Sequence, residues 1–283
     1  MQSVDNAPQS SVNTECACRS TNTPEGFSIS SNVVPEEAWE EIRLYLGLTT
    51  TPKRIDEHNS HGEIIPSIEI DEFGSSASAS TQIPWESTPF PQNRPVAQFG
   101  FRYDYEKDVV VPPTNEINES NNHNSKRVPE IPEVFQRLLL RPYQENTETP
   151  LGSVKFTQCI VNVYRPSTTM ASAIGSKAPG SLSTPIPCTS SIPWHFDDPQ
   201  FGPEILVFTF GETRPLEMRI NNDIDATRRN GTNDADNFTY FTANPSHRSC
   251  YVLSGPARHK WQHSVPSGSS WRVSITFRTL CPP

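Results

Sequence analysis

Residues 271–278 read Trp-Arg-Val-Ser-Ile-Thr-Phe-Arg, a strict alternation of apolar and polar side chains. Because successive side chains of a β-strand point to opposite faces of a sheet, this alternation predicts a strand with one apolar and one polar face. The polar face carries two arginines, Arg272 and Arg278, with two hydroxyls between them. On a solvent-exposed edge strand such a face would be ordinary. In an interior it requires anionic partners, because an unpaired buried guanidinium is costly.

Strand patterns dominate the rest of the C-terminal half of the chain. The sequence predicts helices only at 34–46, which has acidic residues in its first turn and an apolar stripe, and at 132–140. Many short strands with proline-rich connections and few helices are typical of a double-stranded β-helix, or jelly-roll. We therefore predict a mainly β (α+β) fold. The other predicted strands are 99–105, 156–164, 204–211, 216–220 and 249–253.

Composition divides the chain into a domain and polar additions to it. Hydrophobic residues make up 34% of the 283 residues, the mean hydropathy is -0.57, and there are 28 prolines, so part of the chain is expected not to pack into a core. Residues 1–24 are rich in Ser, Thr, Asn and Gln and are predicted to form a disordered tail, which leaves 25–283 as the folded domain. Polar stretches inside this domain are predicted to be insertions, at 48–84, 113–128, 167–191 and 221–240.

The net charge of -9 is concentrated in the front third of the chain. Residues 1–90 hold 4 Lys and Arg against 14 Asp and Glu, whereas residues 91–283 hold 19 against 18. A nucleic-acid-binding domain usually presents a basic face, so the near-neutral back part neither supports nor excludes such a partner. The acidic front is interpreted as a solvated tail.

Cysteine usage and the lack of targeting segments indicate an intracellular protein. The six cysteines follow no metal-binding spacing, and neither a secretory signal nor an apolar run of about 18 residues is seen. We therefore expect reduced thiols, no membrane segment and a cytoplasmic or nuclear location. The sequence does not indicate an oligomeric state.

Residues 194–197, Trp-His-Phe-Asp, carry the first chemistry. In an extended segment His195 and Asp197 point the same way, so they would present an imidazole and a carboxylate to one point in space. A second imidazole would complete a two-histidine, one-carboxylate face that leaves open positions on Fe(II). His-x-Asp alone is a weak signal, because a single histidine in a β protein is more often a core or surface side chain.

Three later histidines could supply the second imidazole, namely His247, His259 and His263. His259 lies beside Lys260, whose charge would repel a metal, whereas His263 ends an aromatic-containing segment directly before the final strand. His263 is favoured, and the residues alone leave the other two open.

A cosubstrate site is predicted beside this metal site. A dicarboxylate such as 2-oxoglutarate would supply the anionic partners of Arg272 and Arg278, since a guanidinium can hold a carboxylate with two parallel hydrogen bonds. Asn162 and Tyr164 share one face of the strand predicted at 156–164 and could donate hydrogen bonds to the same molecule.

Taken together and in this order, these elements resemble the AlkB family of Fe(II)/2-oxoglutarate-dependent dioxygenases. The resemblance spans about residues 25–283, and the front segment resembles the opening strand and helix of that family. It therefore implies a jelly-roll with a short N-terminal helical and strand extension. The matching motifs are 98–105, 162–166, 192–197, 206–211, 253–255, 261–263 and 272–278.

The resemblance also implies roles for individual residues. His195, Asp197 and His263 would bind Fe(II), and Arg272 would pair with the distal carboxylate of 2-oxoglutarate. The remaining three predicted residues would help to hold this cosubstrate. They are Asn162, Tyr164 and Arg278.

The implied reaction is hydroxylation or oxidative demethylation of a modified nucleobase, with single-stranded RNA or tRNA as the partner. Residues 272–278 are closest to the branch that acts on the tRNA wobble uridine. The family usually has a short turn where this chain has the stretch 167–191, which leaves the substrate open. An oxygenase acting on a protein or small molecule is the alternative, because the back part lacks basic stretches. A hydrolase is disfavoured, since no Gly-x-Ser-x-Gly motif occurs.

Overall fold

The computed structural model describes ten stretches of the chain. The predicted insertion at 167–191 and the predicted tail at 1–24 both lie outside them except for their last two residues. The insertion at 113–128 lies outside them except for its last residue. Within the described ranges, none of the helices has the length and apolar composition needed to cross a membrane. The described residues are 23–51, 67–69, 83–89, 92, 94–107, 109–111, 128–146, 154–165, 190–222 and 237–281.

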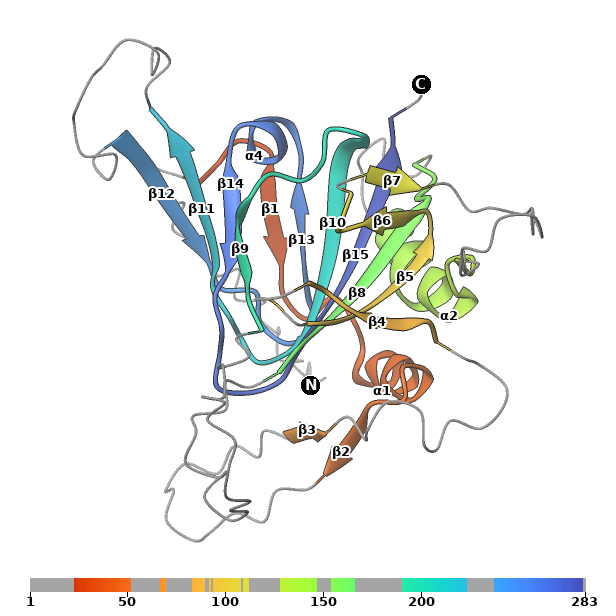
Figure 1. Ribbon diagram of the computed structural model, residues 1–283. Helices are drawn as coiled ribbons and strands as arrows, with labels where there is room; N and C mark the ends of the chain where they lie inside the picture. Colours follow the sequence, from red (N-terminus) through yellow and green to blue (C-terminus); the bar gives the residue numbers. More distant parts are fainter. Residues whose placement is uncertain are drawn as a thin grey trace, which may run out of the picture.

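Two antiparallel sheets form the framework (Figure 1). The larger sheet has the order β1 (Phe27–Ser30), β13 (Ser249–Leu253), β10 (Phe201–Gly211), β15 (Arg272–Leu280), β8 (Gln158–Tyr164), β5 (Pro95–Gly100) and β4 (Trp85–Ser87). The smaller sheet has the order β12 (Phe238–Ala243), β11 (Leu216–Asn221), β14 (Gln262–Val265) and β9 (Ile192–His195).

The eight strands from β8 to β15 switch between the two sheets along the chain. Strands β8, β10, β13 and β15 are central in the larger sheet, while β9, β11, β12 and β14 make up the smaller one. Long-range antiparallel pairing of this kind, with neighbours distant in sequence, is the arrangement of a jelly-roll. The predicted mainly β fold is confirmed.

Short elements complete the fold. Two hairpins are formed by β2 (Thr49–Thr51) with β3 (Ser67–Glu69) and by β6 (Arg102–Asp104) with β7 (Val109–Val111). The hairpin of β2 and β3 lies in the stretch 48–84, which the sequence presents only as a polar insertion. The helical elements are α1 (Glu36–Tyr45), α2 (Glu133–Phe135), the π-helical η1 (Gln136–Leu140), α3 (Arg141–Asn146) and α4 (Gly255–His259).

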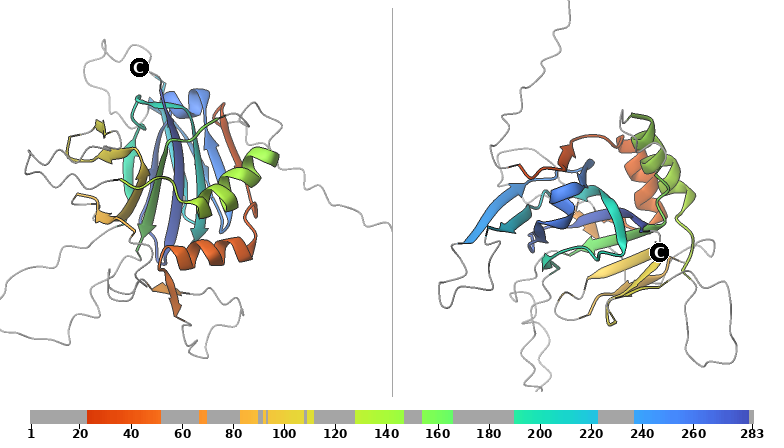
Figure 2. Two further views of the ribbon diagram at one scale, coloured as in Figure 1. Left: turned by 90° about the vertical axis from the view of Figure 1, so that its right-hand side faces the viewer. Right: turned by 90° about the horizontal axis from the view of Figure 1, so that it is seen from above.

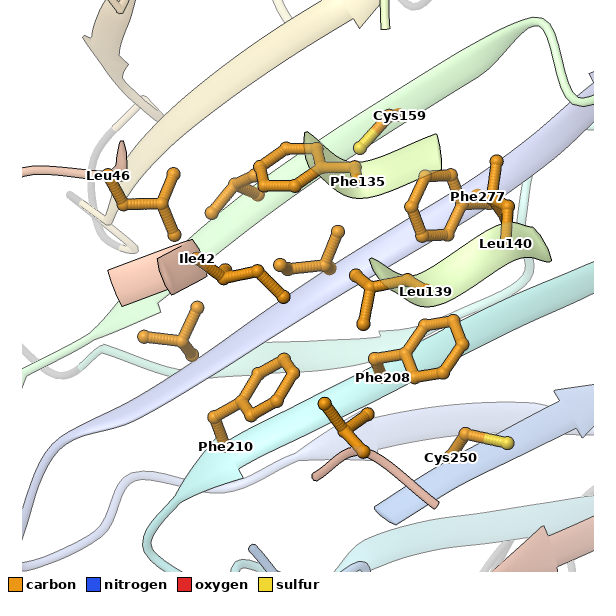
Figure 3. Packing of buried hydrophobic residues seen from close by; sticks show 14 of the residues in the cluster. Ile42, Leu46, Phe135, Leu139, Leu140, Cys159, Phe208, Phe210, Cys250 and Phe277 are labelled. Atoms are coloured by element: carbon orange, nitrogen blue, oxygen red, sulfur yellow. The ribbon is translucent and has the colours of Figure 1, made fainter. Parts of the chain in front are cut away.

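Helices α1 and α2 lie side by side over one face of the larger sheet (Figure 2). Strand β15 shows why: Val273, Ile275 and Phe277 point into the core beneath these helices and are fully buried. Figure 3 shows side chains of the helices packed against aromatic residues of the strands, and Trp39 of α1 stacks on Phe210 with ring centroids 4.3 Å apart. Burial of each such side chain contributes about 1.5–3 kcal/mol. The opposite face of β15 is therefore free to carry polar groups.

The predicted strand at 99–105 is wrong in one respect. Strand β5 ends at Gly100, which has a φ of 74°, and the chain continues into β6 of a separate sheet. A side chain at position 100 would meet the carbonyl oxygen of Thr157 at 2.0 Å, so only glycine fits the left-handed turn. The alternation of aromatic residues runs through this break, and periodicity alone does not reveal it. The helix predicted at 132–140 also runs on to residue 146.

Candidate active site

A cavity of about 380 Å³ lies on the polar face of β15. Its wall comes from both sheets: Ser274, Thr276 and Arg278 of β15 line it, and so do residues of β8, β9, β10, β13 and β14. Ligand sites in proteins are typically concave and of about 300–1,000 Å³. This cavity therefore has the size of a site for small molecules or for one flipped-out group.

Three potential metal ligands meet at the cavity wall. One ligand atom from each of His195, Asp197 and His263 lies within 4.8 Å of the other two. His195 ends β9 and pairs directly across the sheet with His263 of β14, while Asp197 follows two residues after the strand end. The distance from His263 Nε2 to Asp197 Oδ2 is 3.5 Å. Two imidazoles and a carboxylate are the donor set that suits a non-haem Fe(II) with open positions.

The other two histidines considered from the sequence lie elsewhere. His247 packs against Trp39, and its Nδ1 accepts a hydrogen bond from the backbone N–H of Gly211 at 3.0 Å. His259 is exposed at the end of α4. The structure thus brings only His263 to the pair formed by His195 and Asp197.

The protonation states of the cluster suit metal binding. Burial alone would raise the pKa of the Asp197 carboxyl, but the charges of Arg278, the two histidines and Arg258 hold that pKa well below its usual range. Burial, together with the neighbouring His195, lowers the pKa of His263 to about 3. At neutral pH the cluster therefore offers a carboxylate and a neutral imidazole, the forms that bind metals.

This lowered pKa predicts a pH-dependent stability of the metal-free protein. Between pH 6.5 and 5 the unfolded chain protonates His263 while the folded chain does not, so the free energy of unfolding falls as the pH falls. Each pH unit in this window costs about 1.4 kcal/mol, or about 2 kcal/mol in total. Urea unfolding in the presence of a chelator should show a smaller loss in His263→Gln than in the natural protein, because His247, whose pKa burial also lowers, contributes to both. Equal slopes in both proteins would contradict the assignment.

Arg258 of α4 fixes the backbone next to the carboxylate of the cluster. Its Nη1 donates to the carbonyl oxygen of Asp197 at 3.0 Å, and its Nη2 donates to that of Asp198 at 2.6 Å. The side chain is buried. Since the two carbonyls belong to consecutive residues, the guanidinium sets the path of the chain on which Asp197 is mounted.

We therefore expect Arg258→Met to weaken metal binding. Loss of a residue that supports a ligand typically lowers metal affinity by about 10–100-fold. Titration with Mn(II), an inert substitute for Fe(II), would measure this affinity, and melting temperatures would report the fold. Arg258→Lys keeps one donor and should recover part of the affinity. A lower melting temperature with unchanged Mn(II) affinity would show that Arg258 serves the fold alone.

Arg272 is the least satisfied polar group beside the cavity. Its side chain is fully buried, and Nε, Nη1 and Nη2 all lack a hydrogen-bond partner among the described residues. It lies over the ring of Tyr164, 5.0 Å from the centroid, and its charge counteracts the rise that burial causes in the pKa of Tyr251. A buried guanidinium whose three nitrogens have no hydrogen-bond acceptor fits a carboxylate of a dicarboxylic acid such as 2-oxoglutarate.

The remaining predicted cosubstrate residues gather around the same place. Asn162 Nδ2 and the Tyr164 hydroxyl both lie 3.4 Å from the hydroxyl of Ser274, on paired strands β8 and β15. Arg278 Nη2 donates to Asp197 Oδ1 at 2.5 Å and so links the two halves of the site. All three predicted residues line the cavity.

Several cavity residues were not predicted from the sequence. Arg94 precedes β5, and Tyr103 and Tyr105 come from the segment that follows the turn at Gly100. Tyr251 lies on β13. Residues 98–105 are predicted as a strand and as one of the motifs of the family resemblance, without a site role for Tyr103 or Tyr105, and Arg94 carries no motif of its own.

Comparison with known proteins agrees with the geometry of the site. A family model described as the 2OG-Fe(II) oxygenase superfamily matches residues 70–278. The chain is also similar to the solved structure of OsALKBH1, with 14% sequence identity and a TM-score of 0.45, over 91% of this chain and 97% of that one. No curated protein matches. The family match covers well over half of the chain, which therefore belongs to the 2OG-Fe(II) oxygenase superfamily and is an Fe(II)- and 2-oxoglutarate-dependent dioxygenase.

Proposed function

We propose that this dioxygenase hydroxylates or oxidatively demethylates a modified nucleobase in single-stranded RNA or tRNA. The observation that carries the proposal is a group of aromatic side chains that line the cavity beside the three potential metal ligands, here called the aromatic wall. Tyr103, Tyr105 and Phe196 line the cavity together with His195 and Asp197. Proteins that bind unpaired bases commonly hold them by stacking on aromatic rings. A planar base is thus a suitable occupant of this half of the cavity.

The proposal includes the roles of the site residues. His195, Asp197 and His263 hold Fe(II), and Arg272 binds the distal carboxylate of 2-oxoglutarate. Three further residues orient the 2-oxoglutarate. When bound, Fe(II) and 2-oxoglutarate supply the oxidation of a C–H bond by dioxygen, with succinate and carbon dioxide as coproducts. The protein contributes orientation and exclusion of water. The three further residues that orient 2-oxoglutarate are Asn162, Tyr164 and Arg278.

The aromatic wall is held in place by neutral and charged groups of β4 and β5. The side-chain amide of Gln98 donates to the carbonyl oxygen of Tyr103 at 2.9 Å, and its oxygen accepts from the N–H of Tyr103 at 2.7 Å. Glu86 accepts from Gln98 at 2.7 Å and from Arg102 at 3.0 Å. A base entering the cavity therefore meets a preorganised surface, which reduces the entropy cost of binding.

The order of motifs supports placing the chain in the AlkB family within the superfamily. These motifs follow the family's order along the chain. The segment after β5, the pair Asn162 and Tyr164, the three potential metal ligands and Arg278 line one cavity, and Arg272 lies behind its wall, over the ring of Tyr164. The similarity of 272–278 to the tRNA wobble-uridine branch favours RNA over DNA. A base in a duplex would first have to be flipped out, at a cost of a few kcal/mol, so an unpaired base is the easier substrate.

Mass spectrometry of nucleosides tests the proposal. The protein, loaded with Fe(II), 2-oxoglutarate and dioxygen, is incubated with bulk tRNA and with methylated RNA and DNA oligonucleotides. A hydroxylated nucleoside, or a demethylated one with equimolar formaldehyde, is expected at the expense of one modified nucleoside. Retention of RNA should weaken as salt rises, because phosphate contacts release counterions. Succinate formation without any change in nucleosides would contradict a nucleobase substrate.

A protein or small-molecule substrate is the second candidate. It is favoured by the charge of residues 91–283, which hold 19 basic and 18 acidic residues and no long basic stretch. Under this alternative, succinate formation would rise on addition of a peptide or metabolite pool and would not respond to RNA. The two candidates therefore give opposite results in the same assay.

A further inference from the structure

Arg94 places an uncompensated positive charge in the wall of the cavity. Its side chain is only 3% exposed, yet it lines the cavity. Nε donates to Asn162 Oδ1 at 2.9 Å, and Nη1 donates to Gln92 Oε1 at 3.0 Å and to the carbonyl oxygen of Ser191 at 2.9 Å. All three acceptors are uncharged, and within the described ranges no carboxylate forms an ion pair with Arg94. The guanidinium is thus fixed in position without being neutralised.

One donor group of Arg94 remains available. Its Nη2 makes no hydrogen bond to the part of the chain that the structure describes, and it is not among the fully buried unpaired atoms. The guanidinium also lies over the ring of Tyr164, 5.6 Å from the centroid. This N–H group is therefore free to donate to an acceptor that enters the cavity.

The charge of Arg94 acts across the cavity. Burial raises the pKa of the Tyr105 phenol, and Arg94 and Arg278 both counteract that rise, so both charges are felt at the aromatic wall. Arg278 is paired with Asp197, whereas Arg94 is not. Asp198 is the other carboxylate that lines the cavity, and its Oδ1 accepts from the backbone N–H of Gln200 at 2.8 Å. Glu86 also acts on the Tyr105 phenol, but it is paired with Arg102 at 3.0 Å. Of the two arginines that line the cavity, Arg94 is therefore the one without an ion-pair partner among the described residues.

We propose that Arg94 makes the cavity select an uncharged substrate group with a hydrogen-bond acceptor, such as a carbonyl of a uracil-type base, over a cationic alkylated base. This inference rests on the proposed nucleobase substrate. A carbonyl oxygen can accept from Nη2, while a base with a fixed positive charge is repelled by the same guanidinium. In a site with an effective dielectric constant of about 20, a like charge within about 10 Å lowers affinity by about tenfold or more.

Two matched oligonucleotides test the inference. They have the same RNA sequence and carry one 3-methyluridine, which is neutral, or one 3-methylcytidine, which is cationic at neutral pH. Fluorescence anisotropy with the protein loaded with Mn(II) and 2-oxoglutarate measures binding without turnover, and nucleoside mass spectrometry with Fe(II) measures oxidation. The natural protein should prefer the neutral base by about tenfold or more in both assays.

Substitutions at position 94 separate charge from shape. Arg94→Gln removes the charge and should bring the preference to within about twofold, mainly through tighter binding of the cationic base. Arg94→Lys keeps the charge and should keep most of the preference, so it also serves if the glutamine variant folds poorly. Asp198→Asn removes the opposing charge and should strengthen the preference. Arg141→Gln, a guanidinium exposed on α3, is the matched control and should change nothing.

The outcomes distinguish this inference from the function on which it rests. If both oligonucleotides bind and the preference is the same in Arg94→Gln as in the natural protein, the inference is wrong and the nucleobase function stands. A natural protein that prefers the cationic base also overturns it. If neither oligonucleotide is bound or oxidised and no tRNA nucleoside changes, the proposed function fails, and the inference fails with it.

Discussion

Asp197→Ala is expected to abolish the formation of succinate from 2-oxoglutarate, with a loss of more than about 100-fold. Loss of a residue that only supports a metal ligand already costs about 10–100-fold, and Asp197 is the proposed carboxylate ligand itself, grouped with His195 and His263. The assay is run without a substrate, so its result does not depend on knowing the target. Direct titration with Mn(II) should show the same loss of affinity.

Two comparisons make this prediction specific. Alanine at 197 leaves Arg278 without its carboxylate partner, and breaking a buried pair can destabilise a protein by about 3–5 kcal/mol. Asp197→Asn retains the size and a hydrogen-bond acceptor for Arg278, so it should stay folded and still bind Mn(II) poorly. Asp198→Asn removes a neighbouring carboxylate outside the cluster and should keep most of the succinate formation. Turnover by a folded Asp197→Ala protein would refute the metal assignment.

The site residues that could be predicted from the sequence are those whose positions follow from the spacing of nearby residues along one strand. The alternation at 271–278 predicts β15 and the two faces it presents, and the structure places Val273 and Phe277 in the core and Ser274 at the cavity. His195 and Asp197 are likewise two residues apart, so their convergence follows from an extended chain. For these positions, sequence periodicity and tertiary position agree.

The residues that could not be found act on partners far away in the chain. Arg258 contacts the backbone of Asp197, 61 residues earlier, and Arg94 contacts Asn162, 68 residues later. The acceptors of Arg258 are backbone carbonyls, and although Asn162 is predicted from the sequence, no sequence pattern pairs it with Arg94. The choice of His263 over His247 depends on the register of β14 with β9, which is set by the pairing of the smaller sheet. Only the assembled sheets supply this information.

Arg272→Met is expected to stabilise the metal-free protein and at the same time to remove its affinity for 2-oxoglutarate. The three nitrogens of Arg272 make no hydrogen bond of good geometry to the described residues, so the desolvation of its charge is offset only in part, by the Tyr164 ring and the nearby Tyr251 phenol. Even buried charges that are paired can be replaced by apolar side chains of similar volume with no loss of stability or with a gain of about 1–4 kcal/mol, and we expect a gain in this range for Arg272. In a chain of this size that corresponds to a rise in melting temperature of about 2–15 °C.

On the proposed role of Arg272, the effect on 2-oxoglutarate binding has the opposite sign, because the cosubstrate would supply the missing acceptors. Hydrogen bonds to charged groups contribute about 1.5–3 kcal/mol each, so the loss of two of them lowers affinity by more than about 100-fold. Saturating 2-oxoglutarate should raise the melting temperature of the Mn(II)-loaded natural protein and leave that of Arg272→Met unchanged.

Arg272→Lys, which keeps the charge without the planar fork, should gain little stability and bind 2-oxoglutarate weakly. Arg141→Met, on the exposed surface of α3, controls for the loss of any arginine. An Arg272→Met protein that is less stable than the natural protein, or whose melting temperature still rises with 2-oxoglutarate, would show that Arg272 is a structural cation. A guanidinium that serves to bind an anion should instead destabilise the protein without 2-oxoglutarate and stabilise the complex with it.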